Sequence, residues 1–220
     1  MKYFKNFIYS FKEIFLLLIL QYLALFICFI CLGEDKTIVT GTILICIIQV
    51  IYIIYKYRKK NKRRAECNLF PYLLLGVGIS CSYNMILFSM NLGNIVNTDI
   101  NLVLNIICSG IIGPIFEEVL FRYSFMGNLR KFNREKTAIV ISSVVFALCH
   151  TGITTIIYAF IIGFINSYLY VKKKNILIPI IIHISGNIFV NLITDFNLYI
   201  LIIGLFLTIL SCTIISTSKD

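Results

Sequence analysis

The sequence is poor in charge, proline and glycine. Only 14% of its 220 residues are charged, and it contains 3 prolines, 12 glycines and 2 histidines. A soluble domain of this size usually has about a quarter of its residues charged, so an ordinary soluble globular protein is excluded. Disordered chains are rich in charge, proline and glycine, so disorder is excluded as well. The long apolar runs also argue against a coiled coil and against a disulfide-stapled secreted scaffold.

Apolar residues dominate what is present: 59% of the residues are hydrophobic, and the mean hydropathy is +0.92. The length allows about seven or eight spans of roughly 20 residues, with no room for a second folded domain. The predicted spans are residues 14–32, 38–55, 69–90, 102–126, 137–150, 152–171, 176–193 and 198–216. We therefore predict an all-α, polytopic transmembrane helical bundle of about eight spans, forming a single membrane domain over residues 1–220.

The net charge of +10 comes from basic segments that lie between apolar runs. The main ones cover residues 56–64, 130–136 and 172–174. Basic loops lie on the cytoplasmic side of membranes, and eight spans place all three segments on that side only if both termini are cytoplasmic. We predict this topology, with the first span as an uncleaved anchor in a bacterial cytoplasmic membrane. The expected partner of the basic loops is the lipid bilayer and not nucleic acid.

Ionisable side chains are rare inside the predicted spans. Because burying them in a bilayer costs free energy, they are the first place to look for function. The polar residues that we single out are Glu117, Glu118 and Arg122 in the fourth span, His150 at the end of the fifth, and His183 and Asn187 in the seventh. They lie in a core of about residues 102–193.

The spacing of these residues indicates which of them share a helix face. Glu118 and Arg122 are four residues apart and are predicted to form an ion pair with a supporting role. Glu117 points about 100° away and has no basic residue one turn away, so it suits a general base. His183 and Asn187 are also four residues apart.

Two chemistries fit this set of groups, and both hydrolyse an amide in or near the membrane. In one, Glu117, His150 and His183 are the three ligands of a catalytic zinc ion. In the other, no cofactor is required: Glu117, assisted by His150, activates a water molecule, and His183 and Asn187 stabilise the oxyanion. Because an asparagine amide is a poor zinc ligand and a good hydrogen-bond donor, Asn187 favours the second chemistry.

Two readings without proteolysis stay open. The polar cluster could hold helices together in a non-catalytic membrane scaffold or regulator. It could also relay protons in a proton-coupled transporter, although no clear internal repeat supports a transporter.

Three motifs resemble those of the CAAX protease and bacteriocin-processing family of intramembrane endopeptidases, also called the Abi family. They are E-E-x-x-x-R from Glu117 to Arg122, F-x-x-x-H from Phe146 to His150, and H-x-x-x-N from His183 to Asn187. The resemblance implies an all-helical core with the site between these helices. It assigns water activation to Glu117 with His150, and oxyanion stabilisation to His183 with Asn187. The family has been described both as metalloproteases and as glutamic-type proteases, so the resemblance leaves the zinc question open.

The resemblance leaves the substrate open. Eukaryotic relatives trim prenylated proteins, whereas many bacterial relatives act in peptide maturation or bacteriocin self-immunity. The composition, rich in Ile, Lys and Asn, is typical of a bacterial protein. We therefore expect a membrane-associated peptide or protein as the substrate.

Overall fold

The computed structural model describes residues 2–57, 68–92, 101–193 and 195–218. Every regular element in these ranges is a helix, and none of the described residues forms a strand. The predicted all-α class is therefore confirmed. The part of the basic segment 56–64 that follows residue 57 lies outside the described residues.

Eight apolar segments of the sequence correspond to helical segments of the structure. The elements are α1 Lys2–Leu32, α2 Glu34–Tyr57, α3 Phe70–Ser89, α4 Leu102–Asn105, η1 Ile106–Ile112, α5 Gly113–Glu118, η2 Val119–Met126, α6 Gly127–Leu129, α7 Glu135–Leu148, α8 Ile153–Lys173, α9 Leu177–Val190 and α10 Leu198–Thr217. The elements from α4 to α6 follow one another without a break, and η1 and η2 are π-helical.

Six helical segments in the described chain are long and apolar enough to cross a membrane, which makes this a multi-pass integral membrane protein. The stretch Leu102–Leu129 is one of them. Helices α7 and α9 have 14 residues each. At 1.5 Å per residue they are about 21 Å long, which is shorter than the hydrocarbon core of a bilayer.

The chain divides into two compact units, each described here by itself. The first unit comprises Met1–Lys62 and Asp99–Ser142, and the second comprises Arg63–Thr98 and Ser143–Asp220. Helix α7 contributes residues to both. The prediction of a single membrane domain, like that of two cytoplasmic termini, stays a prediction.

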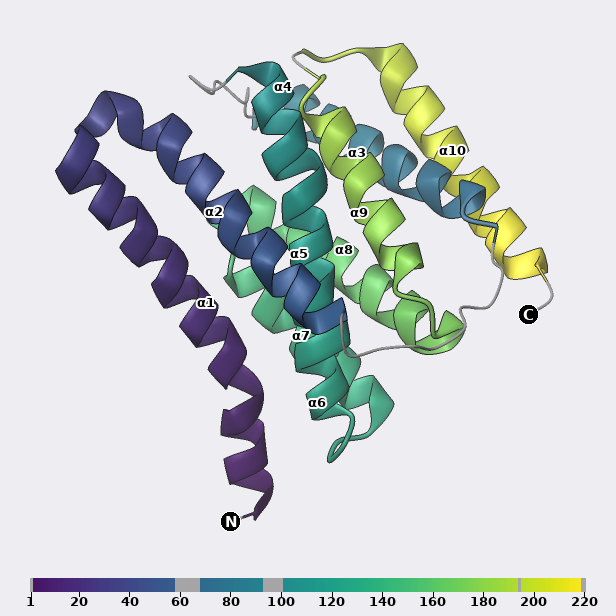
Figure 1. Ribbon diagram of the computed structural model, residues 1–220. Coiled ribbons are helices and arrows are strands. Elements are labelled where there is room, and N and C mark those ends of the chain that lie inside the picture. The colour runs from purple at the N-terminus through teal and green to yellow at the C-terminus, as the bar shows by residue number, and fades with distance from the viewer. Residues whose placement is uncertain (1, 58–67, 93–100, 194, 219–220) are drawn as a thin grey trace. The chain divides into compact units, whose positions relative to one another are not determined.

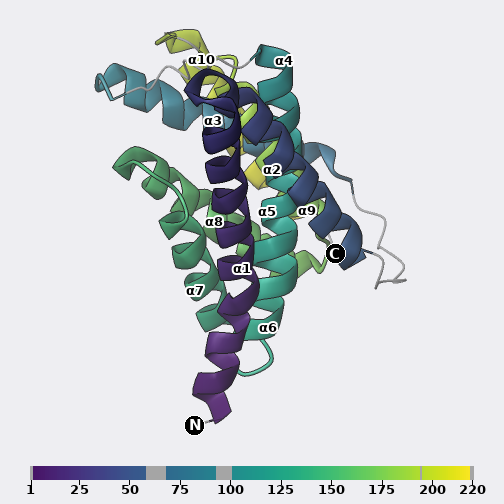
Figure 2. The same cartoon turned by 60° about the vertical axis from the view of Figure 1, so that its left-hand side comes forward.

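In the first unit, α1 and α2 form an antiparallel hairpin (Figure 1). The chain reverses at Gly33, whose φ of +77° is readily adopted only by glycine. Helix α2 packs against η1 and α5, while α1 packs against η2 and α6. The four elements that α1 and α2 contact all belong to the continuous helical column from α4 to α6 (Figure 2). This column carries Glu117, Glu118 and Arg122.

In the second unit, α3 packs against both α9 and α10, and α8 packs against α9. An apolar core lies among α3, α8 and α9, formed by Tyr72, Leu75, Leu169, Ile178 and Ile182. Helices α3 and α9 approach closely at Gly76, where an added Cβ would lie 2.2 Å from the carbonyl oxygen of Ile182. Small residues at such crossings allow the backbones of membrane helices to pack against each other.

Candidate functional site

The paired carboxylates lie on α5, a short α-helical segment between two π-helical ones. Pro114 in the first turn of α5 has no N–H to donate. The preceding π-helical turn ends with the N–H of Gly113 donating to the carbonyl of Cys108, five residues earlier. Helical segments with this wider hydrogen-bond pattern are rare and often occur at functional sites. Glu117 and Glu118 are the last two residues of α5, immediately before η2.

The two carboxylates have different surroundings. The side chain of Glu118 is fully buried, and its Oε2 lies 3.1 Å from Nε of Arg122, which is also fully buried. The predicted ion pair is therefore present. Glu117 is partly exposed, and Arg122 is within electrostatic reach of it as well. Glu118 thus neutralises a buried guanidinium, while Glu117 is partly exposed as a residue and has its Oε2 buried.

His150 lies in the second unit, in the turn that follows α7. Its Nδ1 is 2.9 Å from the carbonyl oxygen of Phe146. A carbonyl oxygen can only accept, so Nδ1 carries the proton and donates it to this hydrogen bond. In the neutral ring, Nε2 then holds the lone pair and can act as a base or a ligand. The turn is completed by Gly152, whose φ of +84° favours glycine.

The two imidazoles contact the same phenyl ring. Phe146 is buried, and its ring centroid lies 4.8 Å from that of His150 and 5.8 Å from that of His183. Both contacts are edge-to-face, with interplanar angles of 63° and 83°. Phe146 is the first residue of the F-x-x-x-H motif. Its ring therefore orients both histidines.

Helix α9 carries His183, which is buried, and Asn187, which is partly exposed. The backbone carbonyl oxygen of Asn187 accepts a hydrogen bond of 2.8 Å from Nδ2 of Asn191. Helix α3 supports the same part of α9, because Oγ of Ser80 donates to the carbonyl of Gly186 at 2.9 Å. The backbone beside Asn187 is thus held from two directions.

The structure distributes the predicted site residues over the two units. Glu117, Glu118 and Arg122 belong to the first unit, whereas the two histidines and Asn187 belong to the second. The carboxylates are brought together on α5, and the imidazoles are brought together on Phe146.

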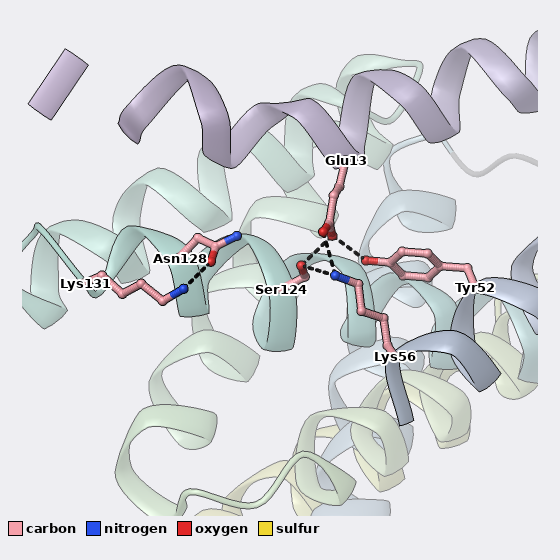
Figure 3. Close-up of polar contacts among 6 residues, drawn as sticks. All are labelled: Glu13, Tyr52, Lys56, Ser124, Asn128 and Lys131. Carbon is pink, nitrogen blue, oxygen red and sulfur yellow. Dashed lines mark hydrogen bonds and ion pairs between the residues drawn. The ribbon is translucent and has the colours of Figure 1, made fainter. Parts of the chain in front are cut away.

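A polar cluster that none of the sequence motifs includes lies in the first unit, where Glu13 binds Tyr52, Lys56 and Ser124 (Figure 3). One signal could have found it. Glu13 is the single acidic residue among the first 33 residues, and it follows Lys12 at the start of an apolar run.

Two imidazoles and a carboxylate form the donor set of a catalytic zinc site. The backbone hydrogen bond of His150 also matches the support that a zinc-binding imidazole usually receives. In the part of the chain that the structure describes, however, no three histidine, cysteine or acidic side chains form a group that could hold a metal ion. The donor types of Glu117, His150 and His183 therefore fit zinc.

Residues 99–189 match the family model described as type II CAAX prenyl endopeptidase Rce1-like. The chain is 31% identical to the membrane-embedded CAAX protease MroQ of Staphylococcus aureus over 170 residues, which cover 67% of this chain and 69% of MroQ. No solved structure matches the chain at a significant level.

Two other bacterial relatives are more similar over a shorter stretch. YdiL of Bacillus subtilis is 38% identical over 87 residues, and the UPF0177 protein YxdF of Lactococcus lactis is 41% identical over 81 residues. The matches cover 40% and 36% of this chain, but only 36% of YdiL and 44% of YxdF. The stretch that matches the family model contains all three sequence motifs, and the similarity to MroQ extends well beyond its length. The chain therefore belongs to the Rce1-like CAAX protease family of membrane peptidases.

Proposed function

We propose that this protein is an endopeptidase that hydrolyses a peptide bond of a membrane-associated peptide or protein. The observation that carries the proposal is the different burial of the neighbouring carboxylates. Glu118 is fully buried against Arg122, whereas Glu117 is partly exposed. A partly exposed glutamate next to a buried, neutralised charge pair is suited to act as a general base.

In the proposed mechanism, Glu117 accepts a proton from the attacking water, and Nε2 of His150 assists. The hydrogen bond from Nδ1 of His150 to the Phe146 carbonyl supports this role, because it leaves Nε2 as the basic nitrogen. The water oxygen attacks the scissile carbonyl carbon and forms a tetrahedral oxyanion. His183 and the Asn187 amide donate hydrogen bonds to that oxyanion. Collapse of the intermediate breaks the C–N bond, and the proton returns to the leaving amine.

The proposed substrate is a membrane-associated peptide or protein. Relatives named as CAAX proteases point to a peptide near its membrane anchor. Maturation of a small peptide and self-immunity against a bacteriocin are two roles in which such a cleavage would serve a bacterium. A zinc ion bound by Glu117, His150 and His183 would supply an activated water and a Lewis acid if it were present.

The test is cleavage of internally quenched peptides by purified protein in liposomes. One peptide carries a farnesylated C-terminal cysteine motif, and a second carries a single transmembrane anchor without a prenyl group. We expect wild-type protein to cleave at least one peptide. Glu117→Gln and His150→Ala should each lower kcat by about 10²- to 10⁴-fold, the usual contribution of general acid–base catalysis. Cys149→Ala is the matched control beside His150, and it should keep its activity.

Adding a chelator to the same assay separates the two chemistries. Loss of cleavage with a chelator, restored by zinc, would support the metal-assisted form. Unchanged cleavage would support the glutamate form. Absence of cleavage by wild-type protein, or full activity of Glu117→Gln, would contradict the proposed function and favour a non-catalytic scaffold. Flux of a solute without any cleaved product would favour a transporter.

A further inference from the structure

A cluster of four polar side chains connects three helices of the first unit. Glu13 lies on α1, Tyr52 and Lys56 lie on α2, and Ser124 lies on η2 (Figure 3). Oε1 of Glu13 accepts a hydrogen bond of 2.6 Å from Nζ of Lys56. Oε2 of Glu13 accepts from the hydroxyl of Tyr52 at 2.9 Å and from the hydroxyl of Ser124. Nζ of Lys56 also donates to Oγ of Ser124 at 3.1 Å. We name these four residues the Glu13 cluster.

The charges of the Glu13 cluster balance, and its members bond to one another. Glu13 is 37% exposed at its side chain and Lys56 is 16% exposed, so the ion pair is partly shielded from solvent. Both residues lie within segments that are apolar enough to span a membrane. A carboxylate with three donors has little remaining capacity for a ligand. The cluster is therefore better suited to fixing helices than to binding a substrate.

The cluster reaches the helical column on both sides of the paired carboxylates. On the C-terminal side, Ser124 is bound directly by Glu13 and Lys56. On the N-terminal side, the ring of Tyr52 packs edge-to-face on Phe116 with centroids 5.5 Å apart. Phe116 is the residue immediately before Glu117. The cluster thus contacts the column before Glu117 and after Glu118.

The segment between these contacts needs external support. Ser124 lies in η2, and π-helical segments are rare because their wider turns pack less favourably than α-helical ones. A second contact from α1 supports the same segment, since the ring centroids of Phe11 and Phe125 lie 4.9 Å apart. On another side of η2, Oγ of Ser142 on α7 donates to the carbonyl of Phe121 at 3.3 Å. Contacts from α1, α2 and α7 thus hold η2 in this form.

We propose that Glu13 is a positioning residue that sets the rotation of α5 and η2, and thereby the direction in which Glu117 points. This inference rests on the proposed function, because direction matters only if Glu117 acts on a substrate. Loss of the Glu13 carboxylate removes the acceptor that Lys56, Ser124 and the Tyr52 hydroxyl share, and leaves Ser124 only its contact with Lys56. The helical column then turns slightly, and Glu117 no longer meets the water in the productive geometry. Small errors of position at a reacting group cost about two orders of magnitude in rate or less.

The experiment measures kcat and KM for wild type, Glu13→Gln, Ser124→Ala and Ser124→Thr with the quenched peptide that wild type cleaves. Rates are divided by the amount of folded protein, taken from the monodisperse peak in size-exclusion chromatography. We expect Glu13→Gln and Ser124→Ala to lower kcat by about tenfold or more while KM changes by less than about twofold. Ser124→Thr keeps the hydroxyl and should restore most of kcat. The double variant Glu13→Gln with Ser124→Ala should have a kcat no lower than that of Glu13→Gln alone, since both changes break the hydrogen bond between Glu13 and Ser124.

Glu135→Gln is the matched control, because it also breaks a glutamate ion pair of the first unit, with Arg130 at an exposed position. It should leave kcat unchanged. If Glu13→Gln lowers only the amount of folded protein and kcat per folded molecule stays at the wild-type value, the cluster has a structural role and the positioning inference is overturned. Additive losses in the double variant would overturn it as well.

Including Glu117→Gln in the same series distinguishes failure of the positioning inference from failure of the proposed function. If wild type cleaves, Glu117→Gln does not, and Glu13→Gln has a normal kcat, only the positioning inference fails. If wild type cleaves neither peptide, or Glu117→Gln cleaves normally, the proposed function fails and the inference falls with it.

Discussion

Glu117 and Glu118 are neighbours in the chain, yet they differ in burial and in their expected contribution to the stability of the fold. Glu118 and Arg122 are fully buried and face each other at 3.1 Å within one helical column. Removing one partner of a buried pair leaves the other charge uncompensated, which costs far more than the pair as a whole contributes. Glu117 is partly exposed and its loss leaves the Glu118–Arg122 pair in place, so it should cost the fold less. Substitution of Glu118 is therefore expected to affect mainly stability, and substitution of Glu117 mainly catalysis.

We predict that Glu118→Gln and Arg122→Met each destabilise the protein by about 3–5 kcal/mol, because each leaves one buried charge unpaired. Glu117→Gln leaves the Glu118–Arg122 pair in place and should cost less, about 1 kcal/mol. Unfolding with increasing mole fractions of SDS in mixed micelles measures these differences. The double variant Glu118→Gln with Arg122→Met should recover much of the loss, since no charge is then buried. Equal stability of all three single variants would show that the pair has no structural role.

Spacing along the chain explains why some contacts of the site could be predicted and others could not. Glu118 and Arg122 are four residues apart, as are Phe146 and His150, and helical geometry alone brings each pair together. Glu13 instead meets Tyr52, Lys56 and Ser124 across separations of 39, 43 and 111 residues. Such contacts depend on how the helices pack, and no local pattern encodes them.

At the scale of elements, apolar length was a sufficient guide to the helices but not to their form. Each predicted span corresponds to a helical segment, and the ends differ by a few residues except at the start of α1, which begins at Lys2 and not at residue 14. The fourth span was predicted as a plain helix, and the structure divides it into α-helical and π-helical parts around Pro114. In an almost continuous apolar run, a change from 3.6 residues per turn to a wider turn leaves no visible periodicity.

Helix packing in the second unit gives a prediction for Gly76. An added Cβ would lie 2.1 Å from Oγ of Ser185 and 2.2 Å from the carbonyl oxygen of Ile182. The backbone oxygen cannot rotate away, so Gly76→Ala must push α3 and α9 apart. We expect a loss of about 3 kcal/mol, measured by the same SDS titration.

Gly127→Ala is the control for this change, because an added Cβ at Gly127 meets nothing within 4 Å. It should be neutral or stabilise the protein by up to about 1 kcal/mol through higher helix propensity. If Gly76→Ala behaves in the same way, α3 and α9 do not pack as described.

At the scale of the whole molecule, the short helices α7 and α9 determine how many times the chain crosses the membrane. Six helical segments of the described chain suffice by length and composition to cross the membrane, whereas the predicted topology uses eight crossings. If α7 did not cross, the basic segments 130–136 and 172–174 would lie on opposite sides of the membrane, since α8 crosses between them. Positive charge strongly favours the cytoplasmic side. We therefore expect α7 to cross together with α8, by local thinning of the bilayer around a helix of about 21 Å.

This expectation can be tested with single cysteines in a variant from which the 8 native cysteines have been removed. Lys131→Cys and Lys172→Cys replace exposed residues of the two basic segments, and Lys36→Cys replaces an exposed residue just after the turn between α1 and α2. We expect a membrane-impermeant maleimide to label positions 131 and 172 from the cytoplasmic side only, and position 36 from the opposite side only. Labelling of 131 and 172 from opposite sides would show that α7 does not cross. The prediction of two cytoplasmic termini would then hold only if α9 did not cross either, because seven crossings place the ends of a chain on opposite sides and six place them on the same side.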